Sequence, residues 1–163
     1  CQLCCTLAPV YEIEKLPFQR CKHLCDSGCS IYSERPKSCR VWSCAWLLTD
    51  MLIAERPDRS HYVVNPILDT LAAGGSDGKI IHFEAVEIWC DPAFPDAHRD
   101  PKLRAFLLTT IPRGLACIRF GSDDDSTILL VPPDLSITGN WEERKSTPTD
   151  KLPEETPHEK QRS

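Results

Sequence analysis

The chain has 163 residues, of which 41% are hydrophobic and 26% charged, and its formal net charge is −5. These values are typical of a globular domain that can bury its own core, and they exclude the strongly basic surface of most nucleic-acid-binding proteins. There is no apolar run of membrane-spanning length and no visible signal peptide, so we expect a cytoplasmic protein that binds neither nucleic acid nor membrane.

Cysteines are concentrated at the N-terminal end of the chain. Eight of the ten lie in the first 44 residues: Cys1, Cys4, Cys5, Cys21, Cys25, Cys29, Cys39 and Cys44. Several are separated by only two to four residues, so a turn can bring two sulfur atoms to the same ion. Disulfides would require an oxidising compartment, and the adjacent Cys4 and Cys5 cannot easily bond to each other. We therefore expect metal ligands, in preference to disulfides or free redox thiols.

Three stretches form a recognisable motif: CQLCC at 1–5, CKHLC at 21–25 and GCSIYSERPKSCRVWSCAW at 28–46. Together they resemble the YkgJ-type family of bacterial cysteine-cluster proteins, and the match covers about the first 46 residues. The resemblance implies a domain that chelates zinc or iron. A similar arrangement occurs in the flagellin lysine methylase family, where an iron–sulfur cluster is the expected cofactor. This chain has no evident S-adenosylmethionine-binding unit.

Other residues of the motif suit a metal site. His23, inside CKHLC, is a reserve ligand, because neutral imidazole binds zinc and replaces thiolate in some iron–sulfur centres. Pro36 favours a rigid turn before Cys39. Arg35 and Arg40 either offset thiolate charge or are ordinary surface residues.

The remaining cysteines, Cys90 and Cys117, stand singly in apolar stretches. A lone cysteine in such a stretch usually behaves as a small hydrophobic residue. We expect both to be buried and away from the metal.

The rest of the chain predicts two pairs of strands separated by a helix. In chain order we expect a helix over 42–55, strands over 61–71 and 79–90, a helix over 100–111 with Asp100 as N-cap, and strands over 115–121 and 126–133. Turn-forming residues between the first two strands predict a hairpin. The apolar phase of the second strand changes near Ala85, which predicts a β-bulge there.

These elements divide the chain into three parts. Residues 1–46 form a cysteine-cluster metal-binding lobe, 47–144 a small α+β region of order β-β-α-β-β, and 145–163 a disordered tail rich in charge and proline. The expected fold class is α+β, with a cysteine-rich metal-binding lobe packed on a small antiparallel sheet with one main helix.

The expected function is metal binding, with zinc ranked ahead of an iron–sulfur cluster, in a structural or sensing role. The predicted ligands are Cys1, Cys4, Cys5, Cys21, Cys25, Cys29, Cys39 and Cys44. The alternative is an iron–sulfur-dependent redox or protein-modifying enzyme, whose acid–base candidates are scattered: His61, His82, Glu84, Asp91 and His98. A third hypothesis is an interaction module whose sheet docks a protein partner.

Overall fold

The computed structural model describes residues 1–48, 55–74, 80–110, 114–123 and 126–145. In chain order its elements are α1 (Cys4–Leu7), η1 (Tyr11–Ile13), β1 (Leu24–Cys25), β2 (Gly28–Cys29), η2 (Tyr32–Glu34), α2 (Lys37–Val41), α3 (Ala45–Leu48), α4 (Pro57–Ser60), β3 (Tyr62–Gly74), β4 (Ile80–Cys90), η3 (Ala97–Arg99), α5 (Pro101–Thr110), β5 (Leu115–Arg119), β6 (Thr127–Val131), η5 (Pro133–Leu135) and β7 (Glu142–Lys145). The fold is mixed α+β, as predicted. In the part of the chain described, no helix is both long enough and apolar enough to cross a membrane.

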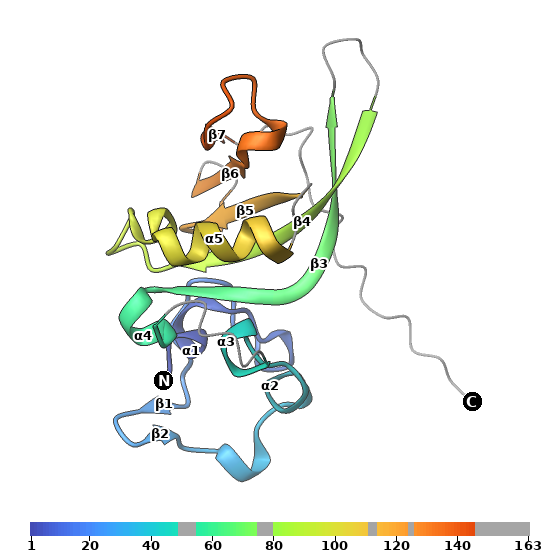
Figure 1. The fold of residues 1–163 in the computed structure, drawn as a ribbon. Coiled ribbons are helices and arrows are strands. Elements are labelled where there is room, and N and C mark those ends of the chain that lie inside the picture. The colour runs from blue at the N-terminus through green and yellow to red at the C-terminus, as the bar shows by residue number, and fades with distance from the viewer. Residues whose placement is uncertain (49–54, 75–79, 111–113, 124–125, 146–163) are drawn as a thin grey trace, which may run out of the picture.

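A five-stranded sheet of order β3-β4-β5-β6-β7 forms the centre of the molecule (Figure 1). The prediction of an antiparallel sheet is wrong for one pair, because β4 and β5 run parallel. The chain leaves β4 at Cys90 and passes through η3 and α5 before it enters β5 at Leu115. Such a helical crossover carries the chain back to the edge of the sheet where β4 begins. The next strand, β5, therefore runs in the same direction as β4.

Strands β3 and β4 confirm the two predicted strands, and they pair antiparallel. The turn between them, 75–79, lies outside the described residues. The predicted bulge at Ala85 is wrong: the register shifts on β3 instead, between Val64 and Leu68. The phase change in β4 has another cause, since Ala85 and Val86 are both buried, on opposite faces of the strand.

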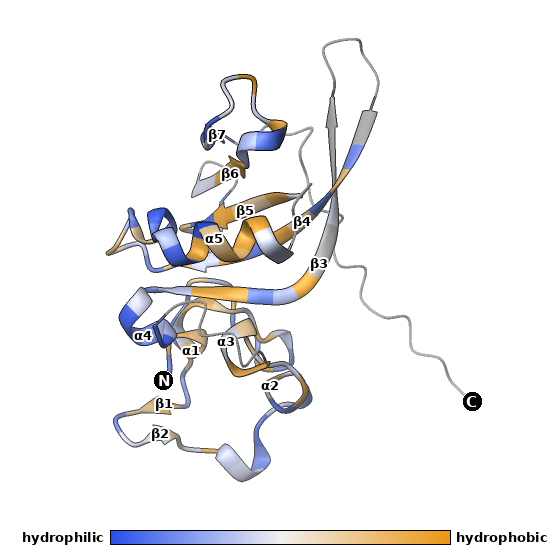
Figure 2. Ribbon diagram, viewed as in Figure 1, coloured by the Kyte–Doolittle hydropathy of each residue, from blue (hydrophilic) through white to orange (hydrophobic). Residues whose placement is uncertain are grey.

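Helix α5 covers one face of the sheet. Its buried residues Leu103, Phe106 and Leu107 pack with Ile88 and Cys90 of β4. Hydropathy colouring shows the strongest apolar colour on β3, β5 and α5, which meet in this core (Figure 2).

The predicted N-cap is confirmed, because Asp100 Oδ1 accepts a 2.9 Å hydrogen bond from the Lys102 amide. Cys90 and Cys117 are both buried in their strands, as predicted. Burial is the main cause that raises the pKa of Cys90 to about 12.

The N-terminal segment packs on the opposite face of β3 and β4. Leu7, Ala8 and Cys44 form a buried cluster with Val63 and Trp89. Because Trp89 stands between Ile88 and Cys90, its side chain points away from α5. Figure 1 shows this segment below β3, with α1 and α3 close to the strand.

Two predicted boundaries change in the structure. Of the helix expected over 42–55, only Ala45–Leu48 is helical among the described residues, and 49–54 lie outside them. The expected tail from residue 145 overlaps β7, which ends at Lys145. Residues 146–163 lie outside the described part of the chain.

Candidate metal centre

Three separate stretches of chain deliver cysteines to the candidate site. Cys4 and Cys5 lie on α1, Cys21 stands before β1, and Cys39 lies on α2. The backbone fixes one of these approaches, because the Cys21 amide donates a 2.9 Å hydrogen bond to the carbonyl oxygen of Cys5. The chain after α1 therefore folds back onto that helix.

Lys15 is buried inside this returning loop, and only 4% of it is exposed. Its Nζ donates hydrogen bonds to the carbonyl oxygens of Ala8 and, at 3.4 Å, of Leu16. Backbone hydrogen bonds of 2.9 and 3.0 Å pair Lys15 with Val10 in both directions. Because Ala8 is the C-cap of α1, the amine is anchored at the end of the helix that carries two of the cysteines.

Four thiols affect the pKa of Lys15. Burial lowers the pKa of Lys15, and negative charge on Cys21, Cys5, Cys4 and Cys39 opposes this fall, in descending order. Cys39 is exposed, and partial desolvation of its thiol is the main cause that raises its pKa, with charge on Cys5 and Cys21 adding to it. These five residues form one electrostatic unit, which we call the thiol–lysine cluster.

The adjacent thiols of the cluster have opposite pKa shifts. A hydrogen bond between the two side chains is the main cause that raises the pKa of Cys4 and lowers that of Cys5. Lys15 lowers the pKa of Cys5 further, while negative charge on Cys44 raises that of Cys4. Cys44, buried just before α3, therefore lies beside the cluster.

A carboxylate clamps the helix that carries Cys39. Glu12 accepts hydrogen bonds from the Ser38 amide at 2.9 Å and from the Ser38 hydroxyl at 2.5 Å. The hydroxyl contact is the main cause that lowers the pKa of Glu12. The clamp joins η1 to the first turn of α2 and so fixes the approach of Cys39 to the returning loop.

Sequence reasoning missed Lys15 and Glu12. A lysine is almost always exposed, so nothing in its residue type indicates burial. The available signal was its position, in the stretch that must fold back to join the CQLCC and CKHLC motifs.

The other predicted ligands are placed differently. Cys25 and Cys29 stand on the β1–β2 hairpin, where the Cys25 thiol donates a 3.2 Å hydrogen bond to the carbonyl oxygen of Gly28. Cys1 is exposed. His23 is half-buried, and its carbonyl oxygen accepts a 2.9 Å hydrogen bond from the Ser30 amide.

The cysteine thiols have the chemistry that a soft metal requires, but the described side chains do not form a complete metal site. The eight N-terminal cysteines are free thiols, and thiolates are the ligands that zinc and iron–sulfur clusters prefer. Among the described residues, however, no three histidine, cysteine, aspartate or glutamate side chains converge closely enough to hold an ion.

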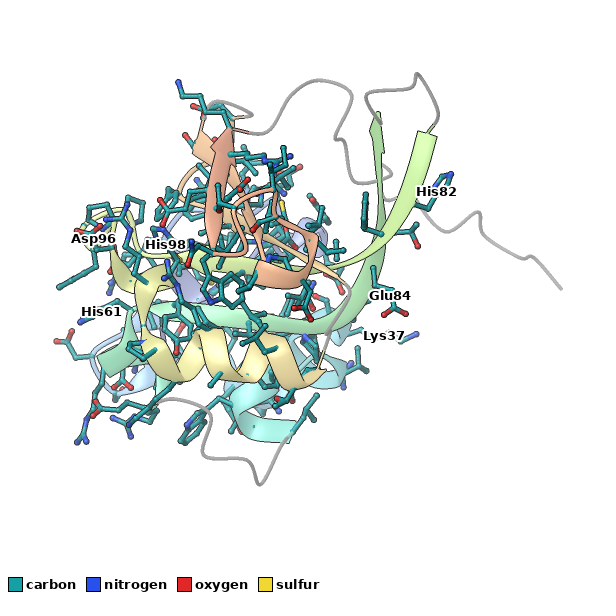
Figure 3. All side chains as sticks on the ribbon, turned by 45° about the horizontal axis from the view of Figure 1, so that its top comes forward. Lys37, His61, His82, Glu84, Asp96 and His98 are labelled. Carbon is teal, nitrogen blue, oxygen red and sulfur yellow. The ribbon has the colours of Figure 1, made fainter. Side chains whose placement is uncertain are left out.

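The acid–base candidates do not share a site. His82 and Glu84 lie on β4, far from His61 and His98 at the other end of the molecule (Figure 3). His61 stacks on Phe94 with 3.5 Å between the ring centroids. His98 is buried, and its Nε2 lies 3.1 Å from Glu143 Oε1.

The Asp91 side chain stabilises a local turn, because it accepts a 3.0 Å hydrogen bond from the Ala93 amide. A hollow of about 310 Å³ near α4 and η3 is lined instead by Glu55, Arg59, Ser60, Asp96, Ala97, Asp100 and Lys102. None of the five acid–base candidates lines it.

Comparisons with models of known protein families, with curated proteins and with solved structures found no match. The resemblance of the cysteine motif to the YkgJ-type family stays a prediction.

Proposed function

We propose that this protein binds a soft metal through its N-terminal cysteines, as zinc or as an iron–sulfur cluster, in a structural or sensing role. The observation that carries the proposal is the thiol–lysine cluster. Cys4 and Cys5 on α1, Cys21 before β1 and Cys39 on α2 come from three separate stretches of chain, and the charge of each affects the pKa of the buried Lys15.

The chemistry of the cluster supports the binding of a metal cation. Four thiolates crowded together repel one another, and a divalent ion bound to all four leaves a net charge of about −2. A positive lysine beside them reduces that excess further. A reducing cytoplasm would keep the thiols free to bind, and the resemblance of the motif to a metal-chelating family favours the same function.

Zinc is the first candidate, since a site of four thiolates matches its tetrahedral preference. Cysteine-only ligation also suits an iron–sulfur cluster. When bound, the metal would link α1, the Cys21 segment and α2 covalently. That is a structural contribution in a segment with little apolar core.

The test is the metal content of the protein purified without air, measured by elemental analysis together with an absorption spectrum. We expect about one zinc ion, or one iron–sulfur cluster with its visible absorption, per chain. The single variants Cys5→Ser and Cys39→Ser should lose most of the metal. The matched control is Cys90→Ala, which removes a buried thiol on the α5 side of the sheet and should keep it.

Two results would refute the proposal. One is wild-type protein that holds no zinc or iron after anaerobic purification and reconstitution. The other is loss of metal from Cys90→Ala equal to that from Cys5→Ser, because this would indicate a general effect on folding.

A further inference from the structure

The central sheet has two free edges that differ in composition. Among the described strands, β7 forms one edge of the sheet and β3 forms the other. Every residue of β7 is charged, and charged residues keep the edge of a sheet from pairing with another chain. Strand β3 has 13 residues, Tyr62–Gly74, and only Asp69 among them carries a charge. The β3 edge therefore lacks the protection that the β7 edge has.

The distal half of β3 extends, with the start of β4, beyond the rest of the sheet (Figure 1). Strand β5 pairs with β4 only from Ala85 to Trp89. Thr70–Gly74 of β3 and Ile80–Glu84 of β4 therefore pair only with each other among the described residues. We call this two-stranded ribbon the β3–β4 arm. Two strands alone are at best marginally stable in water, and a third strand is generally needed to stabilise them.

The arm is accessible to a partner. Thr70, His82 and Glu84 have exposed side chains, and Ile67, at the base of the arm, is 57% exposed. Pro66 comes directly before Ile67 and has no N–H group to donate. An added strand can therefore pair with β3 from Ile67 outward.

The groups on this edge decide what kind of partner fits. The free edge of a strand offers backbone N–H and C=O groups at strand spacing, so the partner must supply an extended edge of its own. Each copy of this chain has such an edge in β3, whereas its other edge, β7, is charged along its whole length. Two β3 edges related by a two-fold axis run antiparallel, and each satisfies the hydrogen-bonding groups of the other.

We propose that the partner is a second copy of this chain, and that two copies dimerise by antiparallel pairing of their β3 strands over Leu68–Gly74. Each β3 then has a strand on both sides, and one continuous sheet crosses the dimer. The dimer leaves the charged β7 edges at its two outer ends, where they stop further growth. This pairing does not depend on metal binding.

The position of the one charge favours a particular register. If Leu71 lies on the two-fold axis, Leu68 is opposite Gly74 of the partner copy, and Asp69 is opposite Ala73. The two Asp69 residues are then about 14 Å apart along the strands. At that separation, salt screens most of the repulsion between exposed charges.

Sedimentation of the reduced wild-type protein tests the dimer. A single pair of strands is a small interface, so we expect a reversible dimer of twice the 18.4 kDa of the chain, with a dissociation constant on the order of 10 μM. A reducing agent excludes dimers linked by disulfides of the exposed Cys1 or Cys39. A protein that stays monomeric at about 1 mM overturns the proposal. An assembly that grows without limit overturns the two-fold pairing.

The variant Thr70→Lys tests the edge itself. Glu84 is opposite Thr70 on β4, so a lysine at this position can pair with it in the monomer, and the arm is kept. In the dimer the two lysines lie close to the two-fold axis, where like charges on paired strands are destabilising. We expect the dimer to be at least about tenfold weaker.

The matched control is His82→Lys, which adds the same charge at an exposed position of the same arm, on β4 and away from the β3 edge. It should leave the dissociation constant unchanged. A dimer that Thr70→Lys does not weaken, or that His82→Lys weakens equally, overturns pairing through β3.

Hydrogen exchange of the wild-type chain needs no variant. Above the dissociation constant, we expect amides within Leu68–Gly74 to exchange more slowly than in dilute protein, because half of their N–H groups face the partner strand. Amides of Glu142–Lys145, at the charged edge, should exchange equally at both concentrations. No change within Leu68–Gly74, or slower exchange at Glu142–Lys145 instead, overturns the proposal.

Discussion

The Glu143 carboxylate on β7 contacts three side chains, two on η3 and one on α5. Its carboxylate accepts two hydrogen bonds of 2.9 Å from Arg99 and lies 3.1 Å from His98 Nε2 and 3.5 Å from Arg104 Nη2. The hydrogen bonds from Arg99 are the main cause that lowers the pKa of Glu143 to about 2. The last described strand is therefore tied to α5 by one side chain as well as by its pairing with β6.

The shifted pKa predicts a pH-dependent contribution to stability. The pKa of Glu143 falls from an ordinary 4.5 to about 2 on folding, so its contribution is complete above the ordinary value and is lost as pH falls towards 2. We expect Glu143→Gln to lower the free energy of unfolding by about 2 kcal/mol at neutral pH. The difference from wild type should shrink at each step below the ordinary pKa.

Urea unfolding of both proteins across this pH range measures the difference. Glu84→Gln is the control, because Glu84 on β4 is an exposed carboxylate and should contribute little. A difference for Glu143→Gln that stays constant down to pH 2 would contradict the assignment.

At the scale of elements, residue pattern located the strands and α5 but not their pairing. β-forming residues predicted β3 and β4, and the Asp100 cap predicted the start of α5. The parallel partnership of β4 with β5 depends on where the crossover returns the chain, which local pattern does not contain. Strand β7 was missed because its sequence, EERK, has no apolar alternation, and it forms by pairing with the edge of β6.

The candidate site shows the same division between local and tertiary information. The spacing of the cysteines predicted that they gather, and a backbone contact joins two of their stretches, the hydrogen bond from the Cys21 amide to the Cys5 carbonyl oxygen. It could not predict which cysteines would meet, since Cys25 and Cys29 occupy a hairpin of their own. Nor could it predict the cation, because the burial of Lys15 depends on the chain folding back onto α1.

The N-cap of α5 gives a prediction at this scale. Asp100 caps the helix through Lys102, and its other oxygen accepts a 2.9 Å hydrogen bond from the Tyr62 hydroxyl on β3. Asp100→Ala removes both contacts and should destabilise the protein by about 2 kcal/mol. Thermal unfolding measures this, with Asp96→Ala as the control, because the Asp96 side chain is 75% exposed. Equal effects of the two variants would refute the capping role.

At the scale of the whole molecule, the N-terminal segment is attached to the sheet at its two ends. Near the start, Leu7 and Ala8 pack on Val63 and Trp89. Near the end, Trp42 packs against Trp89, and its indole nitrogen donates a 3.2 Å hydrogen bond to Asn65. The stretch between these attachments is different, since no residue from 21 to 39 is buried.

This contrast predicts where loss of metal acts. A stretch without buried side chains cannot offset its ordering entropy by apolar burial. If the protein binds a metal as proposed, metal–thiolate bonds would supply order to this stretch. We expect chelation to increase amide hydrogen exchange over residues 21–39. Exchange at Leu7, at Val63 and in β4 should stay close to that of the metal-bound protein.

Hydrogen exchange followed by mass spectrometry on metal-bound and metal-free protein makes the comparison. The core strands serve as the internal control, because their protection depends on the packing of α5 against β4 and not on the cysteines. If residues 21–39 stayed as protected without metal as with it, the hydrogen bonds of the β1–β2 hairpin and the Glu12–Ser38 clamp would be enough to order them. The metal would then have no structural role in this segment. If protection were lost equally across β3 and β4, the segment and the sheet would unfold as one unit, and the shared cluster around Leu7 and Trp89 would couple metal binding to the stability of the whole fold.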